Sequence, residues 1–353
     1  MREVIADIER WRGLGKRIAL ATVVETWGSA PRGAGAKMAL TAEGELAGSV
    51  SGGCVEGAVV EAGRQALKTG QPQLLHFGVA DETAWGVGLA CGGNIDVFVQ
   101  PLDVSIYEVA RREMEAERPA AIVSVVRGPA GWLGRQWLMH DDGRLTGSAP
   151  DDRIAAAAHA ALDAEQPQRI NVPDAAPGPV ELFVDVLLPA PTLIAIGGVH
   201  IAIALTAIAK TLGYRTVVVD PRRAFGSEVR FPHVDRLIQV WPDEALAQIG
   251  LTRSTAVVML THDPKLDDPA LKMALPSPAF YVGALGSRKT QAQRRARLLA
   301  AGVSEAQLAR LHGPIGLELG ARTPEEIALA VMAQIVAARS GRAQPPTEES
   351  PPR

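Results

Sequence analysis

The stretch GSVSGGCVEG, residues 48–57, places Cys54 directly after two glycines and before a segment with helical periodicity. If Ser51 or Gly53 caps that helix, the thiol lies beside free backbone N–H groups at the positive end of the helix dipole. This setting favours the thiolate, which is the nucleophilic and metal-binding form. Gly52 and Gly53 would let a bulky ligand approach the backbone. The alternative is a small apolar side chain buried in the first helical turn.

A second candidate is the glycine-rich stretch GSAPRGAGAKM, residues 28–38, which carries Arg32 and Lys37. Two cations among three glycines suit an anionic group such as a phosphate. The spacing does not match the P-loop pattern. The alternative is a flexible hairpin loop.

Cys91 stands in GLACGGNID, again beside two glycines. It could line the same cleft as Cys54, or it could be a small buried residue that enters a strand. Two thiols without His or Asp at ligand spacing make a poor zinc site, so we expect no structural metal.

The C-terminal half contains a turn, IAIGGVHIA, that partly matches a dinucleotide-binding fingerprint. Gly197 takes the first glycine position and Ala202 the last, but Val199 replaces the glycine that approaches the pyrophosphate. Asp220 ends the next strand, where an acid would bind ribose hydroxyls. His200 could face a ligand or simply pack at the helix start.

Two further polar segments follow apolar strands, at the edge where open α/β sheets bind ligands. They are Thr261-His262-Asp263 and Gly286-Ser287-Arg288.

The elements that must position these residues fall into two styles. Up to about residue 190, short strands and helices occur twice in the same order: KMALTAEGELAGS resembles QWLMHDDGRLTGS, and NIDVFVQPL resembles VELFVDVLLP. Beyond it, apolar strands alternate with helices, which predicts a parallel sheet covered on both faces. The predicted class is α/β. Its domains are two similar α+β units, a Rossmann-like domain and a disordered tail, at residues 1–103, 104–190, 191–340 and 341–353.

The second α+β unit lacks both special loops, because GSAPDDRIA replaces SVSGGCVEG and GPAGWLGRQ replaces GSAPRGAGAK. Scaffold features should occur in both copies. We therefore assign the Gly-Gly-Cys and Pro-Arg-Gly loops to function.

Composition excludes several classes for these 353 residues. The net charge of −3 without a basic block argues against nucleic acid as the main partner. Two cysteines cannot build a disulfide framework, and no apolar run reaches the roughly 20 residues that span a bilayer. The charged start lacks the apolar core of a signal peptide. We expect a cytoplasmic protein without a membrane partner, and a homodimer as the default assembly.

Taken together, TWGSAPRGAGAKM, SGGCVEG, CGGNIDVFVQP, VVVDPR, LTHDPKLDDPAL, YVGALGSRK and GPIGLELGARTPEEIA resemble the xanthine dehydrogenase accessory (XdhC/CoxI) family. The resemblance covers about residues 5–340. It implies an accessory factor rather than a stand-alone enzyme. Such a chaperone binds molybdenum cofactor, a phosphorylated pterin dithiolene, during sulfuration by a cysteine desulfurase and delivers it to a molybdenum hydroxylase such as xanthine or carbon monoxide dehydrogenase.

The resemblance places Cys54 in the family's Gly-Gly-Cys motif, Cys91 in its Cys-Gly-Gly motif and Arg32 at its Pro-Arg position. Cys54 is the expected molybdenum contact or carrier of persulfide sulfur. The expected cofactor ligands are Gly28, Ser29, Arg32, Lys37, Gly52, Gly53, Cys54, Glu56, Cys91, Gly197, Gly198, His200, Asp220, Thr261, His262, Asp263, Gly286, Ser287 and Arg288.

Two rival functions stay open. One is an NAD(P)-dependent oxidoreductase that uses the C-terminal sheet, against which Val199 counts. The other is a scaffold that bridges the desulfurase and the target enzyme without holding cofactor.

Overall fold

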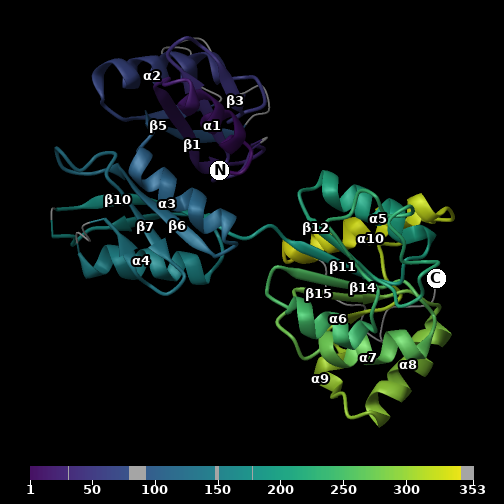
Figure 1. The fold of residues 1–353 in the computed structure, drawn as a ribbon. Coiled ribbons are helices and arrows are strands. Elements are labelled where there is room, and N and C mark those ends of the chain that lie inside the picture. The colour runs from purple at the N-terminus through teal and green to yellow at the C-terminus, as the bar shows by residue number, and fades with distance from the viewer. Residues whose placement is uncertain (31, 79–92, 148–150, 177, 343–353) are drawn as a thin grey trace. The chain divides into compact units, whose positions relative to one another are not determined.

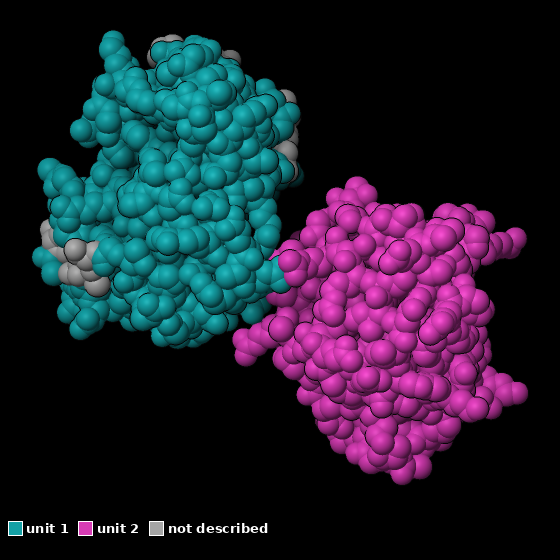
Figure 2. Space-filling model, viewed as in Figure 1, with its two compact units in different colours: residues 1–189 teal, residues 190–353 magenta. Residues whose placement is uncertain are grey.

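The chain forms two compact units, residues 1–189 and 190–353, which Figure 2 colours separately. The computed structural model describes residues 1–30, 32–78, 93–147, 151–176 and 178–342.

Unit 1 contains two five-stranded antiparallel sheets, each with its own helices (Figure 1). The first copy comprises α1 (Ile5–Gly13), β1 (Ile18–Trp27), β2 (Lys37–Thr41), β3 (Leu46–Gly48), α2 (Glu56–Thr69), β4 (Gln73–Phe77) and β5 (Asn94–Pro101). The second comprises α3 (Val104–Glu115), β6 (Ala120–Arg127), β7 (Gln136–His140), β8 (Leu145–Thr146), α4 (Asp152–Asp163), β9 (Gln168–Val172) and β10 (Val180–Leu187).

The two sheets have the same topology, β3-β2-β1-β5-β4 and β8-β7-β6-β10-β9. Their registers also agree, since Leu20 pairs with Gln100 in the first sheet and Ile122 pairs with Asp185 in the second. The predicted repeat of one α+β unit is therefore confirmed. The boundary expected at residue 103 falls between β5 and α3, inside one compact unit.

Each sheet of unit 1 buries one face under its own helix and turns the other toward its copy. In the first sheet, α2 covers the face that carries Ala21, Val23 and Val97. In the second, α4 covers the equivalent face. The opposite faces meet in a shared cluster of Val24, Phe98, Val126 and Phe183. Because side chains alternate along a strand, each residue of β1 or β6 lies either on the face under the helix of its own copy or on the face turned toward the other sheet.

Unit 2 is a six-stranded parallel sheet with the order β13-β12-β11-β14-β15-β16. In chain order it comprises β11 (Thr192–Ile196), α5 (His200–Thr211), β12 (Arg215–Val219), β13 (Arg236–Ile238), α6 (Pro242–Ile249), β14 (Thr255–Met259), α7 (Pro264–Ala274), β15 (Tyr281–Ala284), α8 (Arg288–Ala300), α9 (Glu305–Leu308), β16 (Leu311–His312) and α10 (Pro324–Arg339). The predicted Rossmann-like domain is confirmed.

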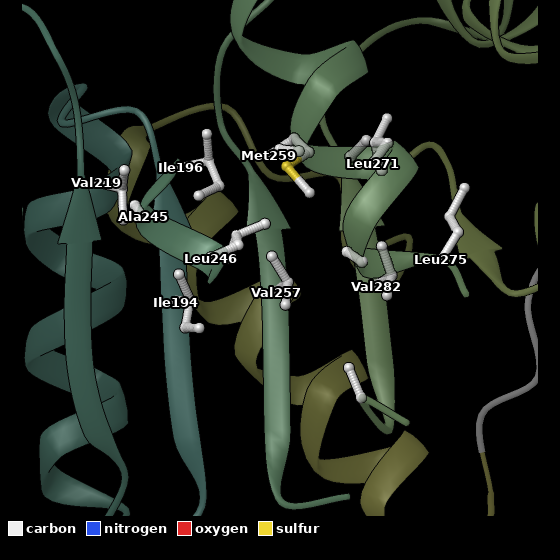
Figure 3. Packing of buried hydrophobic residues seen from close by; sticks show 14 of the residues in the cluster. Ile194, Ile196, Val219, Ala245, Leu246, Val257, Met259, Leu271, Leu275 and Val282 are labelled. Carbon is white, nitrogen blue, oxygen red and sulfur yellow. The ribbon is translucent and has the colours of Figure 1, made fainter. Parts of the chain in front are cut away.

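Helices cover both faces of this sheet, with α5 and α10 on one side and α6, α7 and α8 on the other (Figure 1). Figure 3 shows Leu246 of α6 and Leu271 of α7 packed over Val257, Met259 and neighbouring strand residues. These strands are apolar on both faces, as buried parallel strands are. Because the strands are parallel, their carboxyl ends line up along one edge of the sheet. At this edge β11 and β14 lie side by side at the topological switch point.

Among the residues that the structure describes, no helix combines the length and the apolar character that crossing a membrane requires.

Candidate functional site

The loops singled out in the first copy meet at one end of its sheet. The end of β1 pairs with the start of β5, and the start of β2 pairs with the end of β3. Residues 28–36, here called the glycine loop, join β1 to β2; residues 49–55, the cysteine loop, join β3 to α2. Segment 79–92 joins β4 to β5 at this same end, and Cys91, which it holds, lies outside the described residues.

The cysteine loop is organised by the carboxylate of Glu56. Its oxygens accept backbone N–H groups from Ser51 (2.9 Å), Gly52 (3.1 Å) and Gly53 (2.9 Å), and hydroxyl groups from Ser49 (2.6 Å) and Ser51 (2.5 Å). The ring of donors that a turn of this shape offers to an anion is therefore filled by the chain itself. Glu56 shapes the loop, and the prediction that it binds the cofactor directly is not supported by these contacts.

These contacts also set the ionisation of Glu56. Partial burial opposes the charged form, but the hydrogen bonds from Ser49 and Ser51 outweigh it and lower the pKa of Glu56 to about 2. The carboxylate therefore stabilises the folded loop above the ordinary Glu pKa, and this contribution is lost as the pH falls through about 2.

Replacing Glu56 with glutamine is expected to destabilise unit 1 by about 2 kcal/mol at pH 7. One amide oxygen cannot accept this set of donors, and partial exposure keeps the loss below the sum of the individual bonds. Urea unfolding at pH 7 and pH 3 measures it, and the difference from the natural protein should shrink at pH 3. Glu61→Gln, on an exposed position of the same helix, is the control. Equal stabilities of the two variants at pH 7 would contradict this role.

Cys54 lies just before the helix rather than in its first turn. Its N–H and that of Val55 both donate to Ser51 Oγ at 3.0 Å, and α2 begins at Glu56. The N–H groups of Ser51 to Val55, on both sides of the thiol, are therefore used by Ser51 and Glu56. The side chain itself is partly buried at the rim of the cluster under α2.

The two glycines before Cys54 are required by the backbone. Gly52 has φ of 80° and Gly53 has φ of 124°, values that side-chain-bearing residues rarely adopt. A Cβ on either would have no atom within 4 Å, so the space beside the loop next to the thiol is open. Both backbone shape and open space fit the prediction of a ligand-facing turn.

The glycine loop and Lys37, the first residue of β2, together present fewer cations than the sequence predicts. Lys37 is 2% exposed, and its Nζ lies 2.8 Å from Asp185 Oδ2, so it is not available to an anion. Arg32 is about one third exposed and pairs with Glu3, which also accepts the Lys37 N–H at 3.0 Å. Arg32 is therefore the cation of this loop that a ligand could reach, in exchange for Glu3.

Gly28 and Ser29 are exposed at the start of the glycine loop. Gly93, at the other side of segment 79–92, passes close by: a Cβ there would lie 2.8 Å from Ser29 O and 3.0 Å from Trp27 O. The last glycine of the Cys-Gly-Gly motif is thus explained by a close backbone approach to the glycine loop.

In unit 2 the predicted fingerprint turn packs against its own chain. A Cβ on Gly197 would lie 2.3 Å from Thr261 Cγ2, and one on Gly198 would lie 2.5 Å from Phe225 O. Asp220 is fully buried and accepts the Gly198 N–H at 2.8 Å, while Arg222 bonds to both of its oxygens. The acid expected to bind a ribose is already fully used.

The other predicted ligand residues at this edge of the sheet are either exposed or take part in the structure of the chain next to them. His200 is exposed, 4.0 Å from Glu325, and Arg288 and His262 are exposed as well. Three others serve helix or loop ends: Asp263 caps α7, Ser287 caps α8, and Gly286 has φ of 132°. Thr261 is buried and donates to Asp267.

Sequence reasoning missed a charged cluster at the end of the first sheet. His76 Nδ1 lies 2.6 Å from Asp96 Oδ1, and Arg169 reaches from the second copy to Asp96 and Glu25. Aligning the two copies strand by strand would have pointed to this cluster, because only the first copy has a histidine at this position of the strand.

The described side chains do not provide a protein metal site. In residues 1–30, 32–78, 93–147, 151–176 and 178–342, no three His, Cys, Asp or Glu side chains come together as a ligand set. As far as the described residues go, a metal held beside Cys54 would need further ligands of its own, as a metal–pterin complex has. The open turn and the Cys54 thiol fit such a group.

Comparison with known proteins places both halves of the chain. A family model described as "XdhC and CoxI family" matches residues 11–78, and one described as "XdhC Rossmann domain" matches residues 193–335. The chain belongs to the XdhC and CoxI family. The first match contains both special loops of this XdhC/CoxI protein, and the second contains its parallel sheet.

Relatives of this XdhC/CoxI protein share most of its length. A protein of Bacillus subtilis that is named as a probable xanthine dehydrogenase subunit is 29% identical over 91% of this chain and 92% of its own. The "Molybdenum cofactor insertion chaperone PaoD" of Escherichia coli is 26% identical over 92% of this chain and 84% of its own. A crystal structure titled as a xanthine dehydrogenase from Bacillus halodurans has the same fold, with a TM-score of 0.74, 24% identity and 98% coverage of both chains.

Proposed function

We propose that this XdhC/CoxI protein binds molybdenum cofactor in unit 1 and passes it to a molybdenum hydroxylase of the xanthine dehydrogenase type. The relative named as a molybdenum cofactor insertion chaperone matches across both units, which supports a maturation role. The observation that carries the proposal is the partly exposed Cys54 thiol, on a turn fixed by Glu56 and open on its glycine side.

The roles of the chain's own residues follow from this geometry. The cofactor supplies a molybdenum centre with its own sulfur ligands, and Cys54 would lie beside it as a ligand or as a carrier of persulfide sulfur. Arg32 would release Glu3 and contact the cofactor phosphate. Glu56 and Ser51 hold the turn in place, because their hydrogen bonds fix the backbone on both sides of the thiol.

The same proposal includes a cysteine desulfurase as the partner that sulfurates the bound cofactor. Unit 2 would serve partner binding or cofactor retention rather than hydride transfer, because Asp220 is used by Arg222 and Gly198. No observation favours the oxidoreductase alternative.

Replacing Cys54 with serine is expected to lower the molybdenum retained by the purified protein by about 10- to 100-fold. Mutating residues that only support the ligands of a metal already lowers metal affinity by this factor. The protein is purified without oxygen, molybdenum is measured by mass spectrometry, and pterin is measured by fluorescence after oxidation. Cys91→Ser shows whether the effect belongs to Cys54 alone.

Full retention of molybdenum and pterin by Cys54→Ser would contradict the assignment. A natural protein that captures a desulfurase and a hydroxylase but carries no pterin would favour the scaffold alternative. Calorimetry with NADH and NADPH tests the oxidoreductase alternative, and we expect no binding.

A further inference from the structure

The charged cluster at the end of the first sheet holds one imidazole in a fixed position. His76 Nδ1 lies 2.6 Å from Asp96 Oδ1, and Asp96 is almost fully buried. The other Asp96 oxygen accepts from Arg169, which also bonds to Glu25 at 2.6 Å and Glu181 at 2.9 Å. The acid that orients the imidazole is therefore anchored by a cation from the second copy.

The orientation of this imidazole also assigns its chemistry. A carboxylate only accepts hydrogen bonds, so the proton of the neutral ring lies on Nδ1 and its Nε2 is an acceptor. The His76 side chain is 55% exposed. Gly78 lies beside the ring, but its close approach is to Asn94: a Cβ on it would lie 2.6 Å from Asn94 Oδ1 and at an ordinary contact distance of 3.5 Å from His76 Nε2. Because more than half of the His76 side chain is exposed, we expect an N–H donor of a ligand to reach Nε2.

An exposed aromatic ring lies next to this acceptor. Trp27 is 42% exposed, and its ring centroid lies 6.1 Å from that of His76 in an edge-to-face arrangement. Trp27 ends β1 and directly precedes the glycine loop. A large aromatic surface beside a fixed acceptor is what a planar heteroaromatic ring with N–H groups needs, since it can stack and hydrogen-bond together.

The second copy identifies this pair as an addition to the scaffold. Asp96 pairs with His76, and the equivalent Glu181 pairs with Asn171 in the same register. β6 ends at Arg127, the position equivalent to Glu25, so the second copy has no strand residue in place of Trp27. The aromatic and the imidazole occur only in the copy that carries Cys54.

We propose that Trp27 and His76 form the subsite for the pterin ring of the cofactor, with the ring on the Trp27 indole and one of its N–H groups donating to His76 Nε2. This inference rests on the proposed function. Asp96 and Arg169 are positioning residues, because they touch the imidazole or its acid and not the ligand.

Binding of a pterin monophosphate to the full-length protein tests this subsite. Trp27→Leu and His76→Leu should each weaken binding about tenfold or more, the scale of losing one stacked ring or one hydrogen bond to the ligand. Trp27→Phe should regain most of the affinity. Asn171→Leu, the position equivalent to His76, is the matched control and should bind as the natural protein does. Thermal melting of each variant confirms that it is folded.

The outcomes separate this inference from the proposed function. A natural protein that binds no pterin monophosphate and retains no pterin overturns both. Retained pterin with unchanged affinity in Trp27→Leu and His76→Leu overturns the subsite alone. Loss of molybdenum but not of pterin in His76→Leu would make Nε2 a metal ligand and would also overturn the assignment to the ring.

Discussion

Replacing Lys37 with methionine is expected to destabilise unit 1 by about 3–5 kcal/mol, the cost of leaving one member of a buried ion pair without its partner. Lys37 is 2% exposed and Asp185 is 5% exposed, and their charged atoms lie 2.8 Å apart. Removing the ammonium leaves the Asp185 carboxylate in the seam between the two sheets. Urea unfolding followed by tryptophan fluorescence measures the loss.

The second copy supplies a control for this variant, because a neutral residue takes the position that is equivalent to Lys37. Lys37 and Gln136 open equivalent strands, and each donates to the equivalent hydroxyl: Lys37 to Thr22 at 3.2 Å, and Gln136 to Ser124 at 2.7 Å. Gln136→Met removes only a neutral hydrogen bond and should cost about 1 kcal/mol.

The double variant Lys37→Met with Asp185→Leu separates the loss of a charge from the loss of packing. Because a buried pair replaced by apolar residues is often neutral in stability, the double variant should regain most of the loss. A double variant as unstable as the sum of both single variants would show that the pair is not coupled.

The fold could be predicted from the sequence because its signals are periodic. Alternating apolar strands and helices identified the parallel sheet of unit 2, and the order KMALT, turn, LAG followed by a helix identified the repeat. The helical periodicity after Cys54 corresponds to α2, which is capped by Gly70 at φ of 73°. The helix begins at Glu56, two residues after the thiol, because Glu56 reaches back and holds Ser51 to Gly53 in a turn instead of a helix.

The sequence predicted the shape of the candidate site only where the conformation of a loop depends on residues of the same short segment. The Gly-Gly-Cys turn is such a case. Lys37 was assigned to an anion because its partner, Asp185, lies in the other copy and nothing local announces it. Asp220 was assigned to a ribose although its partner Arg222 is only two residues away, since a ribose-binding acid and an acid used by Arg222 have the same sequence pattern. The ion pairs that form in the folded structure, whether with the other copy or with a nearby residue, decide which charges remain for a ligand.

Replacing Arg294 with methionine is expected to cost unit 2 about 3–5 kcal/mol at pH 7. Arg294 and Asp267 are each about 1% exposed, and Arg294 Nη2 lies 2.9 Å from Asp267 Oδ2 and 3.1 Å from Leu285 O. Thr261 donates to the other Asp267 oxygen, so one guanidinium secures the chain after β14 and after β15. Its loss should loosen both parts of the carboxyl edge.

The pH dependence of this variant tests the mechanism. Burial raises the pKa of Asp267, and the attraction of Arg294 only partly offsets it. Without Arg294 that pKa rises further, so the deficit is largest at neutral pH and shrinks as the pH falls and the acid takes up a proton. Hydrogen exchange read peptide by peptide at pH 7 and pH 5 follows unit 2 separately from unit 1.

The next pair along the same two helices is the matched control. Arg297 Nε lies 2.6 Å from Asp268 Oδ2, but the two side chains are 38% and 20% exposed. Because solvent screens this pair, Arg297→Met should cost less than about 1 kcal/mol and show little change with pH. Similar losses from Arg294→Met and Arg297→Met would contradict the argument, since both are Arg–Asp pairs between the same two helices and only the Arg294 pair is buried.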